Sequence, residues 1–212
     1  MSGLEIMLVL GVAAPLLSFL LLALFGSQIG KPWAGWVATA AMSASTLLAT
    51  VVLIKWQGLA PADRPVPTEF TWAALGSIPV NFGVNLDSLS VIMFFMVSFV
   101  STCIFVFSIG YMAGHSDEID GQSKFHRFFA YLSLFGFSML GLVISNNLLL
   151  LFVFWELVGV CSYLLIGFYF HKKSASDAAI KAFVVNRVGD MGFIIGLAMV
   201  YLYLGDLSLT GA

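Results

Sequence analysis

The sequence predicts an all-α membrane protein with about six transmembrane helices, the N-terminal part of a larger helical bundle. Of the 212 residues, 60% are hydrophobic and only 9% are charged, whereas an ordinary soluble domain has roughly 25% charged residues. The charges also gather between long apolar runs instead of alternating with them. Helices are expected because lipid offers the backbone no hydrogen-bond partner, and the runs lack the short alternating pattern of a membrane β-barrel.

Each of six apolar runs is long enough to cross a bilayer, whose hydrocarbon core of about 30 Å needs roughly 20 helical residues. The N-terminal stretch Met1–Ile6 carries Glu5 and no Lys or Arg, and the apolar run is too long for a signal-peptide core, so we expect a membrane span. The fourth and fifth are separated only by Ser145, Asn146 and Asn147, which we interpret as a tight turn of a helical hairpin. The runs are approximately Leu4–Phe25, Trp33–Ile54, Val84–Met112, Phe128–Ser145, Leu148–Phe170 and Ala178–Leu204.

The connections set the expected orientation. Lys55–Asn81 is a Pro- and Trp-containing loop, too short for a domain, and Ala113–Arg127 is polar and charged. Cytoplasmic connections carry an excess of Lys and Arg, so the side with more of them is predicted to face inward. This places the N-terminus outside, in the periplasm or intermembrane space. The inward residues would be Lys31, Lys124, Arg127, Lys172 and Lys173, against Lys55 and Arg64 outside.

Several function classes are not supported by the sequence. A net charge of −2 does not suit a nucleic-acid partner. Cys103 and Cys161 lie in apolar runs without metal-ligand spacing, and we interpret them as buried, inert thiols. The histidines His115, His126 and His171 fall in polar connections, where solvation at the interface accounts for them. Phosphate-binding and dinucleotide motifs do not appear, so we expect no metal, flavin, iron–sulfur cluster or NADH site on this chain.

The functional signal is the ionisable residues inside predicted spans. Glu156 is the ninth residue of the fifth apolar run, and Lys181, Arg187 and Asp190 are in the sixth. Insertion into the bilayer centre costs roughly 2.5–3.5 kcal/mol for such a residue. We therefore expect a proton or ion path, or a substrate site, between these two neighbouring helices.

Structural explanations remain open for three of the four. Arg187 and Asp190 are three positions apart on one helix face and are able to form a self-satisfied ion pair that fixes helix packing. Lys181 is near the start of its helix and four residues after Asp177, so its side chain is able to extend to the interface. Glu156 has no partner on its own helix, so its partner must come from another helix, or the carboxyl is protonated at rest.

The sequence resembles the antiporter-like subunits of respiratory complex I, and specifically the L subunit (mitochondrial subunit 5). WELVGVCSYLLIGF, from Trp155 to Phe168, is similar to the fifth-helix signature of these subunits. KAFVVNRVGD, from Lys181 to Asp190, resembles the sixth helix of the L subunit. The stretches FFAYL at 128–132 and LDSLS at 86–90 fit the same subunit.

The resemblance implies roles for individual residues. It makes Glu156 a proton-path residue that responds to a charge on a neighbouring subunit, and places Asp190 in the same path with Arg187 beside it. It divides the chain into three N-terminal helices over 1–112, with an external loop at about 55–83, and the first three helices of an antiporter-like repeat over 113–212. The seventh helix and second repeat of such subunits would then be absent, so the chain is expected to be a portion that forms no complete proton route.

The expected function is a proton-translocating membrane-arm subunit of NADH:quinone oxidoreductase, in a bacterial plasma membrane or an organellar inner membrane. Flavin and iron–sulfur clusters would belong to partner subunits, and the nearest partner would be the adjacent antiporter-like subunit. A second interpretation is the large subunit of a multi-subunit Na⁺/H⁺ antiporter, which shares the Trp-Glu of the fifth helix. A third is a non-transporting membrane scaffold, which an unpaired Glu156 fits poorly.

Overall fold

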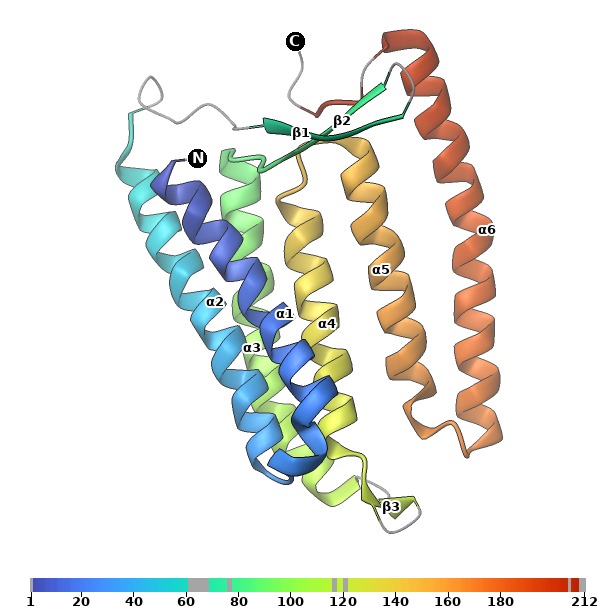
Figure 1. Ribbon diagram of the computed structural model, residues 1–212. Helices are drawn as coiled ribbons and strands as arrows, with labels where there is room; N and C mark the ends of the chain where they lie inside the picture. Colours follow the sequence, from blue (N-terminus) through green and yellow to red (C-terminus); the bar gives the residue numbers. More distant parts are fainter. Residues whose placement is uncertain are drawn as a thin grey trace.

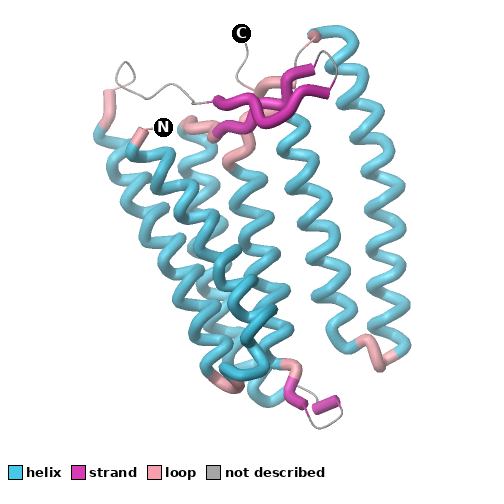
Figure 2. Tube along the Cα trace, in the orientation of Figure 1, coloured by secondary structure: helices cyan, strands magenta, loops and turns pink. Residues whose placement is uncertain are grey.

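The structure is a computed structural model that describes residues 2–60, 69–75, 78–115, 118–119, 122–205 and 207–209. Within this part of the chain, six helices are long and apolar enough to cross a membrane, which confirms the predicted fold class (Figures 1 and 2). A short 3-10 helix at Gly167–Tyr169 follows α5. The helices are α1 Gly3–Ile29, α2 Trp33–Gly58, α3 Ser88–His115, α4 Phe125–Val143, α5 Leu148–Ile166 and α6 Lys173–Leu204.

Helices α1 to α4 pack into one cluster, and α5 and α6 extend from it as a hairpin (Figure 1). The α1–α4 cluster has a dense aromatic core in which Phe94, Phe105, Phe125 and Phe129 are fully buried. Helix α5 packs on α4, whereas α6 packs mainly on α5 and stands at the outer edge. Most side chains of α6 are consequently exposed in this chain. The residues of α6 that are buried are Ala179, Asp190 and Leu197.

The contact between α4 and α5 depends on a glycine. The ring of Phe154 lies directly on Gly141, and a Cβ at position 141 would overlap that ring. Phe154 also meets Phe137 edge-on, with 5.6 Å between the ring centroids. Only a residue without a side chain allows the two helices to approach this closely. This contact contributes to the position of α5, and therefore of Glu156.

The predicted turn at 145–147 is confirmed. Asn147 caps α5 with its side chain, whose oxygen accepts a hydrogen bond from the Leu150 N–H at 2.6 Å. Because the amide of Asn147 satisfies a donor of the first turn, α5 begins at the next residue. The turn also binds neighbouring segments through the backbone: Asn85 N–H donates to the Ile144 carbonyl, and Leu209 N–H donates to the Asn146 carbonyl. Segments that precede α3 and follow α6 are thus fastened to one end of the α4–α5 hairpin.

Three predicted helix starts differ from the structure. Helix α3 begins at Ser88 instead of Val84, which pairs with Ser145 in an isolated β-bridge before the helix. Helix α4 begins at Phe125 instead of Phe128, so His126 is half-buried in its first turn, with its side chain against Gly26, and does not lie in a polar connection. Helix α6 begins at Lys173 instead of Ala178. The prediction used hydropathy, which marks the apolar span, whereas a helix continues through polar residues into the interface as long as its backbone bonds continue.

Short antiparallel hairpins occupy the connections at the two ends of the helices (Figure 2). Strand β1 (Glu69–Leu75) pairs with β2 (Ile78–Gly83), with an irregular register between Thr71 and Ala73. This hairpin lies within the predicted external loop, at the end where α1 begins (Figure 1). Strands β3 (Glu118–Ile119) and β4 (Gln122–Ser123) form a small hairpin at the opposite end. Pro61, Pro65 and Pro67 of the loop lie outside the described residues.

Candidate functional site

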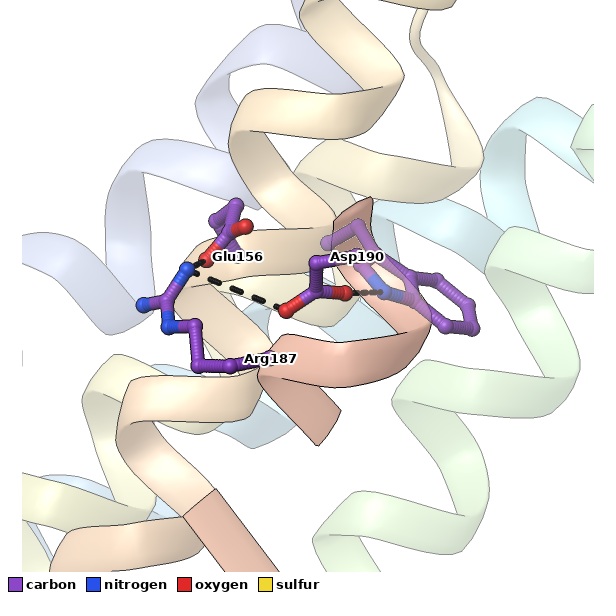
Figure 3. Close-up of polar contacts among 4 residues, drawn as sticks. Glu156, Arg187 and Asp190 are labelled. Atoms are coloured by element: carbon purple, nitrogen blue, oxygen red, sulfur yellow. Dashed lines mark hydrogen bonds and ion pairs between the residues drawn. The ribbon is translucent and has the colours of Figure 1, made fainter. Parts of the chain in front are cut away.

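Three of the four predicted site residues meet between α5 and α6. The Nη1 nitrogen of Arg187 donates to the Oε2 oxygen of Glu156 and lies 3.8 Å from the Oδ2 oxygen of Asp190. Figure 3 shows both carboxylates turned toward this guanidinium group. We call Glu156, Arg187 and Asp190 the ionic cluster. Arg187 is the partner from another helix that Glu156 was expected to need.

Helix geometry explains why the ionic cluster forms. Glu156 is near the middle of α5, and Arg187 and Asp190 are separated by less than one turn of α6. Side chains three positions apart lie on the same helix face, and this face of α6 is turned toward α5. The Arg187 guanidinium carbon also lies 4.8 Å from the ring centroid of Phe183 on the same helix. The aromatic ring supports the cation while the carboxylates neutralise it.

A further polar contact involves a residue that sequence reasoning did not select. The indole Nε1 of Trp155 donates to the Oδ1 oxygen of Asp190 at 3.0 Å. Successive helical residues are about 100° apart, so Trp155 reaches Asp190 from one side of α5 while its neighbour Glu156 reaches Arg187 from another. A tryptophan in a membrane helix is ordinarily explained as apolar packing. The available signal was its position directly beside an intramembrane carboxyl.

Lys181 does not join the ionic cluster. It is exposed on the first half of α6. Within the described residues no ion pair joins it to a carboxylate. Nine positions separate it from Asp190, which places the two on opposite sides of the helix. Its expected role in a proton path remains a prediction without a structural contact.

The ionic cluster borders an open groove of about 700 Å³ on the face of α5 and α6. Exposure increases across the cluster: the side chains of Asp190, Glu156 and Arg187 are 11%, 20% and 41% exposed. Of the three, Asp190 lines the groove, whereas Glu156 and Arg187 are partly exposed outside its lining. Groove-lining residues with polar groups are Trp155, Ser162, Asn186 and Asp190.

The described cysteine and histidine side chains, which are the usual metal ligands, lie outside the ionic cluster. Cys161 is buried in α5, as expected, but Cys103 is exposed on α3, so its expected burial was wrong. It lies on an apolar helix surface, where hydropathy cannot distinguish a residue that faces the protein from one that faces lipid. His171 is exposed in the connection between α5 and α6. Among the described residues, no group of three His, Cys, Asp or Glu side chains is arranged to hold a metal ion.

The chemistry of the ionic cluster follows from its charge balance. Two carboxylates share one guanidinium, so the fully ionised cluster carries one negative charge in an environment where isolated charge is costly. Uptake of one proton makes it neutral. The second oxygen of Glu156, Oε1, has no hydrogen-bond partner among the described residues and is open to accept that proton. A single proton is therefore what would balance the charge of this cluster between the two helices.

Comparisons with known protein families identify the same regions. A family model described as "NADH:quinone oxidoreductase/Mrp antiporter, TM" matches residues 145–212. A second, described as "NADH-Ubiquinone oxidoreductase (complex I), chain 5 N-terminus", matches residues 72–129. The first match contains the entire ionic cluster.

Several curated proteins are similar over most of this chain. NADH-quinone oxidoreductase subunit L of Neisseria meningitidis serogroup B is 42% identical over 90% of the chain and 27% of its own length. The protein of the same name from Mycobacterium tuberculosis is 41% identical over 94% of the chain and 30% of its own length. That of Rhodobacter capsulatus is 44% identical over 87% of the chain. The chain thus spans less than a third of the length of the curated relatives it matches.

Solved structures share the fold. A chain of the membrane-bound sulfane sulfur reductase, an archaeal respiratory membrane complex, matches with a TM-score of 0.73 and 19% identity over 95% of this chain and 38% of its own. A chain of the Mrp complex from Dietzia sp. matches with a TM-score of 0.71 and 22% identity over 99% of this chain and 20% of its own. At these identities the similarity concerns the arrangement of the helices.

Proposed function

We propose that this chain carries part of a proton path in the membrane arm of NADH-quinone oxidoreductase, because it belongs to the family of antiporter-like L subunits (subunit 5) of that enzyme. It spans about a quarter of the length of the relatives it matches. The single observation that carries the proposal is the position of Glu156. It is a partly buried carboxylate near the middle of a membrane helix, held by one cation that a second carboxylate also contacts.

The proposed mechanism uses the three charged groups of the ionic cluster. In the ionised state Arg187 pairs with Glu156. A proton that binds to Glu156 weakens this ion pair and leaves Arg187 free to turn toward Asp190. Loss of the proton restores the first arrangement. Such a change needs no large backbone movement, because the same Nη1 nitrogen already lies 3.8 Å from Asp190.

The partners follow from this role. NADH oxidation and quinone reduction would occur on other subunits, which would also hold the flavin and iron–sulfur clusters. The adjacent antiporter-like subunit of the membrane arm would present the charge to which Glu156 responds. We also propose that α4 to α6 are the first three helices of an antiporter-like repeat, although α4 packs against α1 to α3.

The orientation proposed from the basic residues places the N-terminus and the β1–β2 hairpin outside. The connections that contain Lys124 and Lys172 would then face the cytoplasm or matrix. The ends of the helices are consistent with this arrangement, since Lys124 lies over the Phe170 ring and Lys172 over the Tyr169 ring at the same end of the bundle. Such contacts allow basic side chains to remain at an interface.

A Na⁺/H⁺ antiporter subunit is the second candidate, because the family model over residues 145–212 covers Mrp antiporters as well. Inverted membrane vesicles that contain the complete natural protein distinguish the two. For the proposed function, addition of NADH and a quinone drives proton uptake that depends on the gene for this protein. Proton movement that instead requires a Na⁺ gradient, and is unaffected by NADH, would support the antiporter.

A further inference from the structure

Trp155 makes a contact that the proposed mechanism does not yet use. Its indole N–H donates to the Oδ1 oxygen of Asp190, while the Oδ2 oxygen of the same carboxylate faces Arg187. An indole is a donor only and has no lone pair with which to accept a proton. The contact therefore fixes which oxygen of Asp190 is occupied and which one points toward the guanidinium.

The indole itself is held in place. The Trp155 and Phe193 ring centroids are 6.2 Å apart, and Phe193 packs in turn against Phe152 at 5.4 Å. Phe193 is three positions after Asp190, on the same face of α6. The indole thus has an aromatic contact and a hydrogen bond on α6, which together fix its orientation.

The two carboxylates differ in how they would accommodate a proton. A proton on Oε1 of Glu156 meets no donor among the described residues, and Arg187 can then turn to Oδ2 of Asp190. Asp190 would then accept two hydrogen bonds, one from Trp155 and one from Arg187. A proton on Oδ2 of Asp190 would instead point at a guanidinium, which cannot accept it. A proton on Oδ1 would displace the indole N–H of Trp155, which is half-exposed, and break the hydrogen bond between the two helices.

We infer that Trp155 is a positioning residue that keeps Asp190 ionised and so directs the exchangeable proton of the ionic cluster to Glu156. This inference rests on the proposed function, because it assigns the place of the proton within the same site. Arg187 then moves between two fixed acceptors, and Trp155 sets the position of one of them. Loss of the indole N–H frees Asp190 to rotate and to compete for the proton.

The test measures protonated carboxyl groups by infrared difference spectroscopy on the complete enzyme complex, as a function of pH. In the parent we expect a carboxyl band that titrates, that is lost in Glu156→Gln and that remains in Asp190→Asn. In Trp155→Phe we expect a second titrating band, which is lost when Asp190→Asn is added. Trp36→Phe, which makes the same change at an exposed tryptophan of α2, should give the parent spectrum.

Two results would overturn the inference: a Trp155→Phe spectrum identical to that of the parent, or loss of the parent band in Asp190→Asn. If Trp155→Phe does not assemble, replacement of the indole by benzothiophene, through incorporation of β-benzothienylalanine, keeps the ring size and removes only the N–H. This variant should then show the second titrating carboxyl band expected for Trp155→Phe. Proton pumping in Glu156→Gln is a separate readout, so a normal rate there contradicts the proposed function whatever the infrared bands show.

Discussion

The guanidinium of Arg187 on α6 donates to the carboxylate of Glu156 on α5, 31 positions earlier in the chain. Helix α6 packs mainly on α5, so this contact joins the outermost helix to the rest of the molecule through a titratable group. Protonation of Glu156 would weaken it. The charge of one carboxyl is in this way linked to how the two helices hold together.

The first prediction concerns how the ionic cluster shares its cation. Because Arg187 contacts both carboxylates, Glu156→Gln or Asp190→Asn alone should leave it with one partner and cost less than about 1 kcal/mol of stability. The double variant removes both partners, and a half-exposed lone cation should cost about 1–3 kcal/mol, below the 3–5 kcal/mol of a fully buried pair. Addition of Arg187→Gln to the double variant should restore assembly.

Assembly of the enzyme complex in membranes, measured by native electrophoresis after heating, checks this order. Lys181→Gln is the matched control, because it removes a cation from the same helix without touching the cluster. Additive losses in the double variant, with no recovery in the triple variant, would mean that Arg187 is not shared.

A second prediction tests the contact that positions α5. Gly141→Ala places a methyl group against the Phe154 ring, and overpacking of this kind costs about 1–3 kcal/mol. Gly110→Ala on α3 is the control, because a Cβ there meets no atom within 4 Å. Both changes raise helix propensity by the same amount. Thermal stability should fall for Gly141→Ala alone; equal stability of the two variants would contradict the packing.

The third prediction concerns orientation. A cysteine at Ser174, in the first turn of α6, should react with a membrane-impermeant maleimide only from the cytoplasmic or matrix side. A cysteine at Gln57, near the end of α2, should react only from the outside. Both positions are exposed. Cys103 is replaced by Ser in the parent, since it is a free and exposed thiol. Labelling of Ser174→Cys from the outside of intact cells would reverse the proposed topology.

The membrane spans were predictable because burial in lipid leaves a long apolar run that needs no knowledge of tertiary contacts. The turn at 145–147 was predictable for the same reason, since three polar residues interrupt a run too long for one crossing. The hairpin of β1 and β2 was not predicted. Its segments, EFTWAAL and IPVNFG, contain aromatic and β-branched residues that favour strands, but their pairing depends on backbone hydrogen bonds that a loop interpretation of this stretch did not consider.

For the site, the sequence indicated Glu156, Arg187 and Asp190 through their cost in a membrane. It could not show that Glu156 is paired with Arg187, because the pair depends on how α5 and α6 face each other. The sequence also could not distinguish Lys181 from Arg187 and Asp190, because it does not show which side of α6 faces α5. Trp155 was missed because its apolar ring accounts for its presence, and only the structure reveals its N–H on Asp190.

The central claim is that Glu156 carries a proton. Glu156→Gln keeps the size and hydrogen-bonding capacity of the side chain but removes its charge. The control is Asp177→Asn, an exposed carboxyl on the same helix as Arg187. Glu156→Asp, which keeps an ionisable group at a shorter reach, should retain part of the activity. NADH oxidation by a water-soluble artificial acceptor should be unchanged in all three variants, because it bypasses the membrane arm.

The most direct measurement is NADH-driven proton uptake, recorded together with NADH:quinone turnover, in inverted membrane vesicles with matched content of the assembled complex. Because proton movement and quinone reduction are coupled in the proposed function, both should fall together by at least about tenfold in Glu156→Gln, which corresponds to roughly 1.4 kcal/mol. Both should stay at the parental level in Asp177→Asn. Normal turnover with a normal ratio of protons to electrons in Glu156→Gln would contradict the claim and leave Glu156 as a partner of Arg187 with a structural role only.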